Sequence, residues 1–308
     1  MRAAGIQRID SAVEVLELPE PRALAADEVL IEVAAAGVGN WDEIVRTGGW
    51  DVGSTPPMAL GVEAAGTVVA VGADVTDVVV GAEVLTHPLP LREQGTWAER
   101  LIAPANLVGS KPAGVSWEAA AAFVVPALTA EQVLSEALSV QSGQTLLVHG
   151  ASGITGGMLV ELAVLRGLRV IATAGPAAHD RVRALGAAEV LDYHDDDWPS
   201  QVLRFSGGGV DLVANAARGG AATALSAVVD GGRLATITSD TPAAERGITM
   251  SEVYVRPDGD QLTGLAALLG EGQLTVTVAG RCSFADAGEA LAKVVKGTSG
   301  GAVVLTPM

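Results

Sequence analysis

The sequence predicts a two-domain α/β protein, with a β-barrel at its N-terminal side and a doubly wound parallel sheet after it. Residues 1 to about 118 read as short strands between turn residues. From Trp117 to about Ser239, strands instead alternate with helices, and one strand enters a helix through a glycine-rich turn. The 308 residues are enough for two domains with their own cores, and no long linker or internal repeat indicates further modules.

Composition narrows the class of protein. With 49% hydrophobic and 18% charged residues the chain reads as soluble and globular. Its net charge of -17 argues against nucleic acid and against anionic membrane surfaces as partners. The single cysteine, Cys282, excludes an internal disulfide and a multi-cysteine zinc site. The segment MRAAGIQRID lacks the apolar stretch of a signal peptide, so we expect a cytoplasmic protein that acts on a small molecule.

Each predicted element follows from local composition. The barrel strands are rich in Val, Ile, Leu or Ala and bounded by Gly, Pro or Asp, and are expected at 12–18, 28–35, 66–71, 82–86 and 98–102. In the second domain the segment 118–138 is helical in composition, and strands are expected at 145–148, 169–174, 190–192, 211–215 and 232–238. A helix at 261–269, the segment FADAGEALAKVVKG and a strand AVVLTP complete the chain.

The turn after the strand at 145–148 is built from a GxxGxxG pattern. Gly150 allows a tight reversal, Gly153 allows close approach of a ligand, and Gly156 lets the next helix pack against the strand. The free N–H groups and positive dipole end of that helix suit a diphosphate. The context favours a dinucleotide site formed by Gly150, Ser152, Gly153, Ile154, Thr155 and Gly156, and the alternative is that the glycines only permit close packing.

Seven stretches over essentially the whole chain resemble one family: 35–48, 60–84, 95–104, 126–134, 146–157, 185–193 and the ending GGAVVLTP. The sequence is similar to the zinc-free quinone oxidoreductases of the medium-chain dehydrogenase/reductase superfamily, the group that includes zeta-crystallin. The resemblance implies a GroES-like β-barrel domain at 1–118, completed by 262–308, and a Rossmann domain at 119–261. Zinc-dependent relatives place a zinc-ligating cysteine and histidine where this sequence has Gly39 and Val62, so no metal is expected.

The cofactor prediction depends on the strand at 169–174. A dehydrogenase that prefers NAD usually ends this strand on an acid, but here it runs into Gly175. Relatives that use NADPH have Ser, Lys and Tyr nearby; this sequence keeps Tyr193 but has Pro176 and His179 at the Ser and Lys positions. NADPH is favoured, with Thr173, His179, Arg181, Tyr193 and Asn215 as further predicted contacts. The alternative for His179, Arg181 and Arg183 is a solvated helix face.

Candidate substrate contacts come from the segment GVGNWDEIVRTGGW, because the resemblance implies that this loop faces the nicotinamide. Asn40 offers an amide donor and Asp42 a carboxylate, and both are candidate catalytic residues. Relatives commonly carry Asn at the position of Gly39, one residue earlier. Asp42 has an alternative role as a hydrogen-bonded residue at a helix start. Trp41 and Trp50 offer flat surface for a planar substrate, or alternatively pack in the core.

Thr129 is the third candidate catalytic residue, because it matches a family threonine beside the nicotinamide. Its alternative is a helix N-cap with Gln132 completing a capping box.

Three functions are compatible with these residues. The first is NADPH-dependent hydride transfer to a quinone or an activated C=C bond, without zinc. The second is an enoyl reductase acting on a biosynthetic, polyketide-type intermediate, and the third is a non-catalytic NADPH-binding protein. The resemblance also implies a homodimer paired through the Rossmann domain, for which we expect the strand at 232–238 and Tyr254 to form the interface.

Overall fold

The computed structural model describes residues 1–298 and 300–307. The chain divides into two compact units: unit 1 is 1–128 with the described part of 256–308, and unit 2 is 129–255. The first division lies inside a helix, α2 (Trp117–Gln132), later than the predicted boundary at 118. One physical reason is that Val125, in this helix, donates its backbone N–H to a carboxyl oxygen of the buried Glu63 in unit 1 at 2.8 Å.

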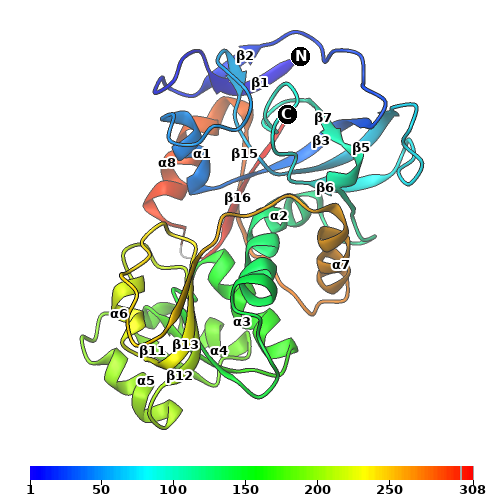
Figure 1. Cartoon of the computed structure of the whole chain (residues 1–308). Helices are drawn as coiled ribbons and strands as arrows, with labels where there is room; N and C mark the ends of the chain where they lie inside the picture. The colour runs from blue at the N-terminus through cyan, green and yellow to red at the C-terminus, as the bar shows by residue number, and fades with distance from the viewer. Residues whose placement is uncertain (299, 308) are drawn as a thin grey trace. The chain divides into compact units, whose positions relative to one another are not determined.

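Unit 1 is built from two mainly antiparallel sheets (Figure 1). Among the described residues, a seven-stranded sheet has the order β15-β16-β3-β5-β6-β8 with β7 paired to β3, and a three-stranded sheet has the order β2-β1-β4. The strands are β1 (Arg2–Ile6), β2 (Glu14–Glu17), β3 (Glu28–Val38), β4 (Met58–Ala59), β5 (Ala64–Val71), β6 (Glu83–Thr86), β7 (Arg100–Pro104), β8 (Val108–Ser110), β15 (Val278–Ser283) and β16 (Ala302–Thr306). All five predicted barrel strands are present. The alanine- and glycine-rich β1 was not predicted, and its pairing on both sides compensates for its low strand propensity.

The helices of unit 1 include α1 (Asn40–Arg46), α7 (Gly259–Gly270) and α8 (Ala287–Lys296). Helix α2 contains Pro126, which lacks an N–H and disturbs the helical hydrogen bonds around it. The side chain of Glu63, the residue just before β5, accepts the N–H of Val125, the residue before this proline. This hydrogen bond joins the start of β5 to α2. A π-helical turn, Val133–Ala137, follows α2 in unit 2.

Unit 2, all of whose residues are described, contains a parallel six-stranded sheet in the order β11-β10-β9-β12-β13-β14. Its strands are β9 (Thr145–His149), β10 (Arg169–Ala174), β11 (Glu189–Asp192), β12 (Val210–Asn215), β13 (Val228–Thr236) and β14 (Thr249–Glu252). The connecting helices are α3 (Ile154–Leu165), α4 (His179–Ala184), α5 (Trp198–Ser206) and α6 (Ala221–Leu225). Because right-handed crossovers run outward from β9 in both directions, α3 and α4 cover one face and α5 and α6 the other (Figure 1). The predicted two-domain α/β fold with a doubly wound parallel sheet is confirmed.

The strand expected at the dimer interface does not lie at the edge of this sheet. It was predicted at 232–238, and the corresponding strand β13 is paired on both sides, with β12 and with β14. The edge on this side is β14, a strand that the sequence analysis missed because TMSE has no continuous apolar run. Any extension of the sheet on this side must therefore begin from β14.

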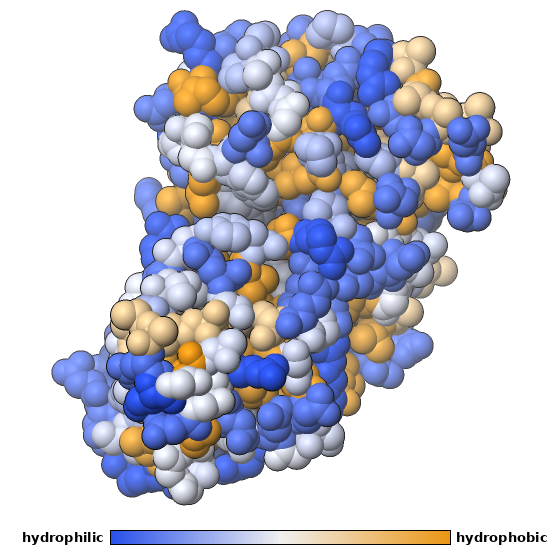
Figure 2. Space-filling view, in the orientation of Figure 1, coloured by the Kyte–Doolittle hydropathy of each residue, from blue (hydrophilic) through white to orange (hydrophobic). Residues whose placement is uncertain are grey.

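The surface agrees with the charged composition. On the face seen in Figure 2, hydrophilic side chains cover most of both units, with smaller hydrophobic groups between them. Among the described residues, no helix combines the length and the hydropathy that a membrane span requires.

Candidate functional site

The glycine turn of unit 2 connects β9 to α3, and its three glycines have different surroundings. Gly150 has φ +90°, and a Cβ atom there would lie 2.9 Å from the carbonyl carbon of Ala216. A Cβ atom at Gly156 would lie 2.2 Å from the carbonyl oxygen of Gly150. A Cβ atom at Gly153 would meet only this oxygen, at an ordinary 3.6 Å. The fold itself therefore requires glycine at 150 and 156, whereas the exposed Gly153 leaves space on the outer side of the turn.

The start of α3 lies at the carboxyl end of β9, at the point where the strand order reverses. Gly153 is the N-cap residue, and Ile154 and Thr155 open the helix, half-buried like Ser152 before it. Since the first N–H groups of a helix have no partner within it, this position can hold an anionic group. Arg181 contacts the same turn, because its Nη2 donates a 2.6 Å hydrogen bond to the carbonyl oxygen of Ser152.

Four buried polar side chains form one row across the carboxyl edge of this sheet. Strand register pairs Thr173 with His149, His149 with Asn215, and Asn215 with Thr236. Each is at most 6% exposed. Thr173 and Asn215, both predicted as cofactor contacts, therefore lie beneath the loops rather than on the surface.

Asp240 closes the row at its β13 end. Its carboxylate accepts hydrogen bonds from the hydroxyls of Thr236 at 2.6 Å and Thr238 at 2.8 Å, from the Asn215 amide, and from the N–H of Ala221. Burial opposes its ionisation, but these donors outweigh burial and lower the pKa of Asp240. The sequence analysis missed Asp240, because a single acid in a loop carries no signal until the strand ends are seen together.

The end of β10 carries the other predicted cofactor residues. His179 uses its Nε2–H to donate to the carbonyl oxygen of Ala174 at 3.0 Å. Tyr193 is 46% exposed and its ring contacts that of His194 at a tilt of 32°, and both rings lie close to Gly175. Arg183 pairs with Asp180 on an exposed helix face, so the solvated-face alternative holds for Arg183 and not for Arg181.

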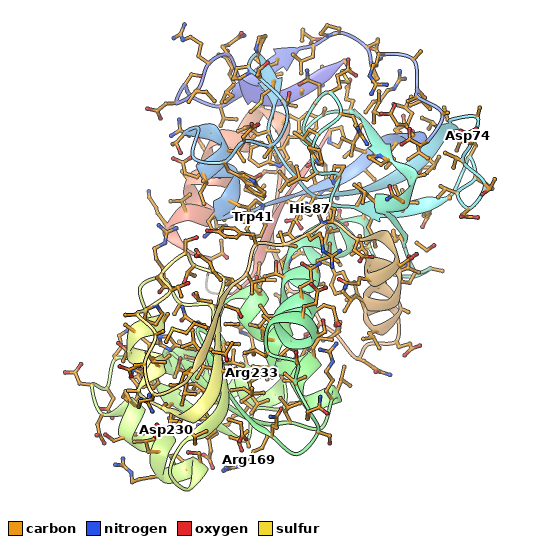
Figure 3. All side chains as sticks on the ribbon, in the orientation of Figure 1. Trp41, Asp74, His87, Arg169, Asp230 and Arg233 are labelled. Atoms are coloured by element: carbon orange, nitrogen blue, oxygen red, sulfur yellow. The ribbon has the colours of Figure 1, made fainter. Side chains whose placement is uncertain are left out.

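In unit 1, the predicted substrate residues lie in helix α1 and in the loop that follows it. Asn40 is exposed at the first turn, and Trp41 and Trp50 are half-buried. The indole ring of Trp41 (labelled in Figure 3) occupies the space that a side chain at Gly39 would need, since a Cβ atom there would lie 1.9 Å from Cε2 of the ring. Among the described residues, the buried Nε1–H of Trp41 has no hydrogen-bond partner.

Asp42 has the alternative role considered for it, that of a hydrogen-bonded residue at the start of a helix. Its Oδ2 accepts the N–H of Gly39 at 2.8 Å, three residues earlier, which fixes the start of α1. The residue is 0% exposed, and burial raises the pKa of Asp42 to about 8. Burial also raises the pKa of Glu63 well above its usual value, and the negative charge of Asp42 adds to this effect. These two carboxyl groups therefore favour their neutral forms.

His87 is a further buried group, and it was not among the predicted site residues. Its Nδ1–H donates to the carbonyl oxygen of Val62 at 2.7 Å, and burial lowers the pKa of His87 to about 4. The ring is therefore neutral at pH 7, and its tautomer is fixed by the backbone carbonyl.

Thr129 lies within α2, which begins at Trp117, and it is 7% exposed. The helix N-cap alternative is wrong, because the apolar residues before Thr129 continue the helix through Pro126 instead of ending before the threonine.

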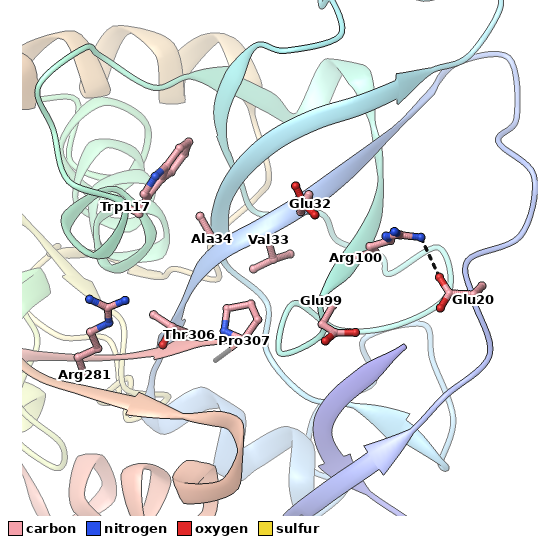
Figure 4. A pocket seen from close by; sticks show the side chains of 10 residues that line it. All are labelled: Glu20, Glu32, Val33, Ala34, Glu99, Arg100, Trp117, Arg281, Thr306 and Pro307. Atoms are coloured by element: carbon pink, nitrogen blue, oxygen red, sulfur yellow. Dashed lines mark hydrogen bonds and ion pairs between the residues drawn. The ribbon is translucent and has the colours of Figure 1, made fainter.

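The predicted site does not coincide with a cavity found in unit 1. Among residues 1–298 and 300–307, no group of three or more His, Cys, Asp or Glu side chains is placed to hold a metal ion. A cavity of about 600 Å³ in unit 1 is lined by residues that include Glu32, Trp117, Arg281 and the Arg100–Glu20 ion pair (Figure 4). None of the predicted site residues lines it.

Two family models match the chain. Residues 25–127 match the alcohol dehydrogenase GroES-like domain, and residues 185–305 match a model described as zinc-binding dehydrogenase. Together they cover parts of both units, which agrees with a GroES-like domain combined with a Rossmann sheet.

Individual proteins match along most of the chain. The human synaptic vesicle membrane protein VAT-1 homolog is 31% identical over 194 residues, covering 63% of this chain and 48% of that protein. Erythronolide synthase from Saccharopolyspora erythraea is 34% identical over 227 residues, covering 70% of this chain and 6% of the synthase. The chain thus spans about half the length, or less, of these curated relatives.

Solved structures match over the full length. A mycobacterial protein in complex with NADPH is 28% identical with a TM-score of 0.86, and both chains are covered completely. A mycobacterial quinone oxidoreductase is 29% identical with a TM-score of 0.82, again with complete coverage of both chains.

Proposed function

We propose that this chain, which belongs to the medium-chain dehydrogenase/reductase superfamily, is a zinc-independent, NADPH-dependent reductase of quinones or activated C=C bonds. The observation that carries the proposal is the glycine turn, which leaves open space outside Gly153 at the start of α3. Bound NADPH supplies the hydride. The chain's own residues would bind its diphosphate through the N–H groups at the start of α3.

Preference for NADPH over NADH is supported by the end of β10. No acidic side chain follows Ala174 along the chain before Asp180, so the acid with which an NAD-preferring strand usually ends is missing. Arg181 lies against the turn through Ser152, and the exposed Tyr193 lies beside Gly175. A guanidinium and a phenol at this strand end suit a phosphate group.

Independence from zinc is supported by the donor set. Gly39 and Val62 stand where the resemblance implies ligands, and the space at 39 is filled by an indole. Carbonyl polarisation would then depend on hydrogen-bond donors of the chain. We assign the Nε1–H of Trp41 to this role, because it is a buried donor without a partner among the described residues. Asn40 and Thr129 remain predicted contacts of substrate and cofactor.

The direct test is oxidation of NADPH, with NADH in parallel, against quinones, simple enones and enoyl thioesters in the presence of a chelator. We expect turnover with quinones or enones, faster with NADPH, and unchanged by the chelator. Loss of activity on chelation, restored by zinc, would contradict the zinc-independent proposal.

An enoyl reductase function is the second candidate, favoured by the 34% identity to a segment of erythronolide synthase. In the same NADPH oxidation assay, this function would give turnover of enoyl thioesters at a rate that depends on acyl chain length. NADPH binding without any turnover would support a non-catalytic role instead.

The donor assigned to Trp41 has its own test. Trp41→Phe keeps a flat ring over Gly39 but removes the N–H, so kcat/KM for the quinone is expected to fall about tenfold while the Kd of NADPH is unchanged. Trp117→Phe, a change of the same kind in the cavity of Figure 4, serves as the control and should leave both values unchanged. An unaltered kcat/KM in Trp41→Phe would remove Trp41 from the proposal.

A homodimer is proposed with β14 as the interface strand. As an open edge it can pair with β14 of a second copy across a two-fold axis, which continues the sheet. Tyr254, which is 72% exposed and bonded to Glu252 and Ser239, lies just beyond this strand. Light scattering should give the mass of two chains, and the mass of one chain would refute the dimer.

A further inference from the structure

A short chain of hydrogen bonds lies beneath the glycine turn of unit 2. The Oγ1 of Thr173 accepts the N–H of Gly150 at 3.1 Å and lies 2.6 Å from Nδ1 of His149. Thr173 is 0% exposed and His149 is 6% exposed. The first residue of the turn is therefore linked to an imidazole through one buried hydroxyl.

The hydrogen bonds of Thr173 determine which ring nitrogen of His149 carries the proton. A hydroxyl carries one proton, and leaving that proton buried without an acceptor is costly. Since Thr173 already accepts from Gly150, its own proton is satisfied by donation to Nδ1 of His149. Nδ1 is then the acceptor, and the neutral ring carries its proton on Nε2. The opposite tautomer would direct two N–H groups at the same oxygen and leave the hydroxyl proton without a partner.

The ring of His149 is held in place from both sides. It stacks on Trp198 of α5, with ring centroids 4.8 Å apart and an interplanar angle of 16°. On another side it fills the space beside Gly220, where a Cβ atom would lie 2.4 Å from Nε2. Gly220 belongs to the loop after β12, so His149 contacts both loops that leave the sheet at its switch point.

We propose that His149, through the hydroxyl of Thr173, is a positioning residue that holds the N–H of Gly150 and the loop at Gly220 in the geometry that binds the dinucleotide. This inference rests on the proposed function, because it deepens the account of the same cofactor site. Neither side chain is assigned a contact with the cofactor.

The electrostatic surroundings keep this arrangement intact at neutral pH. Burial lowers the pKa of His149 to about 4, although the carboxylate of Asp240, the charged group that acts on the ring, partly opposes this effect. Protonation at Nδ1 would force the hydroxyl of Thr173 to turn away, so the neutral ring is the one that supports the turn.

The tautomer can be read directly by nitrogen NMR of protein labelled with ¹⁵N-histidine. The chain has only four histidines, and His149→Phe identifies the resonances of His149. At pH 7 we expect Nδ1 to show the shift of an unprotonated nitrogen and Nε2 that of a protonated one, with and without NADP⁺. The reverse assignment would overturn the inference whatever the cofactor does.

Binding of NADP⁺ to the full chain, measured by calorimetry, tests the consequence. Thr173→Val removes the hydroxyl, and His149→Phe keeps a ring on Trp198 but removes Nδ1; each is expected to raise the Kd about tenfold. Thr173→Ser keeps the hydroxyl and is expected to restore binding to within about twofold of the original.

The outcomes separate the two proposals. An unchanged Kd in folded Thr173→Val and His149→Phe, beside normal binding by the unaltered protein, overturns the inference only. Failure of the unaltered protein to bind any nicotinamide cofactor overturns the proposed function, and with it the role assigned to His149. Circular dichroism and the melting temperature show whether each variant is folded, and a failure of Thr173→Ser to bind would also count against the inference.

Discussion

Gly153→Ala is expected to raise the Kd of NADPH at least about tenfold while the melting temperature stays within about 2 °C. The new methyl group would meet the carbonyl oxygen of Gly150 at an ordinary 3.6 Å, and the backbone, at φ -75° and ψ 168°, is open to any residue. The fold therefore tolerates alanine. The methyl group would, however, occupy the space outside the turn that the diphosphate is proposed to fill.

Gly156→Ala is the matched comparison. Its Cβ would lie 2.2 Å from the carbonyl oxygen of Gly150, so the turn must move and a loss of about 1–3 kcal/mol of stability is expected together with weaker binding. Calorimetry for binding and thermal unfolding for stability distinguish the two variants. If Gly153→Ala binds NADPH normally, the glycines only permit close packing, and the proposed diphosphate site is wrong.

Asp42→Asn is expected to stabilise the protein at pH 8 and to have little effect at pH 4. Burial raises the pKa of Asp42 to about 8, above its value in the unfolded chain, so the folded state binds a proton more tightly. The sign follows from linkage: the contribution of Asp42 to the free energy of unfolding decreases as the pH rises from about 4 to about 8, by up to about 1.4 kcal/mol per pH unit, and is then constant. The amide of Asn cannot ionise, so the variant lacks this contribution to the slope.

The same variant retains an oxygen that can accept the N–H of Gly39, so helix α1 keeps its start. Denaturant unfolding at several pH values measures the slope in both proteins. We expect turnover in Asp42→Asn to stay within about tenfold of the original, because the role seen for Asp42 is structural. Equal slopes in the two proteins would show that Asp42 is ionised in the folded state, and a much larger loss of turnover would return it to the catalytic residues.

The sequence predicted the Rossmann sheet well because its signals are local. Apolar strands, a glycine turn and the helix after it each depend on neighbouring residues, and the strand at 169–174 was predicted with its observed bounds. The short strands β1, β4, β8 and β14 were missed, because their pairing partners, and not their own composition, make them strands.

The candidate site was predicted less completely, for a related reason. Thr129 was weighed as a helix N-cap because Gln132, three residues later, could complete a capping box. In the structure α2 continues past Pro126, and the contact of Glu63 with Val125 lies just before this proline. Asp240 gains its importance only where the ends of β12 and β13 meet. His149 directly precedes the glycine turn in the sequence, but its bond to Thr173 depends on strand register.

The packing of Trp41 into the space beside Gly39 makes these two positions epistatic. A side chain can enter at 39 only if residue 41 is small, and a small residue at 41 alone leaves a void over the glycine. A variant with Asn or Gln at position 39 must therefore replace Trp41 by a smaller residue before or together with the change at 39. Libraries that vary one position at a time would reject both changes, although the double variant can fold.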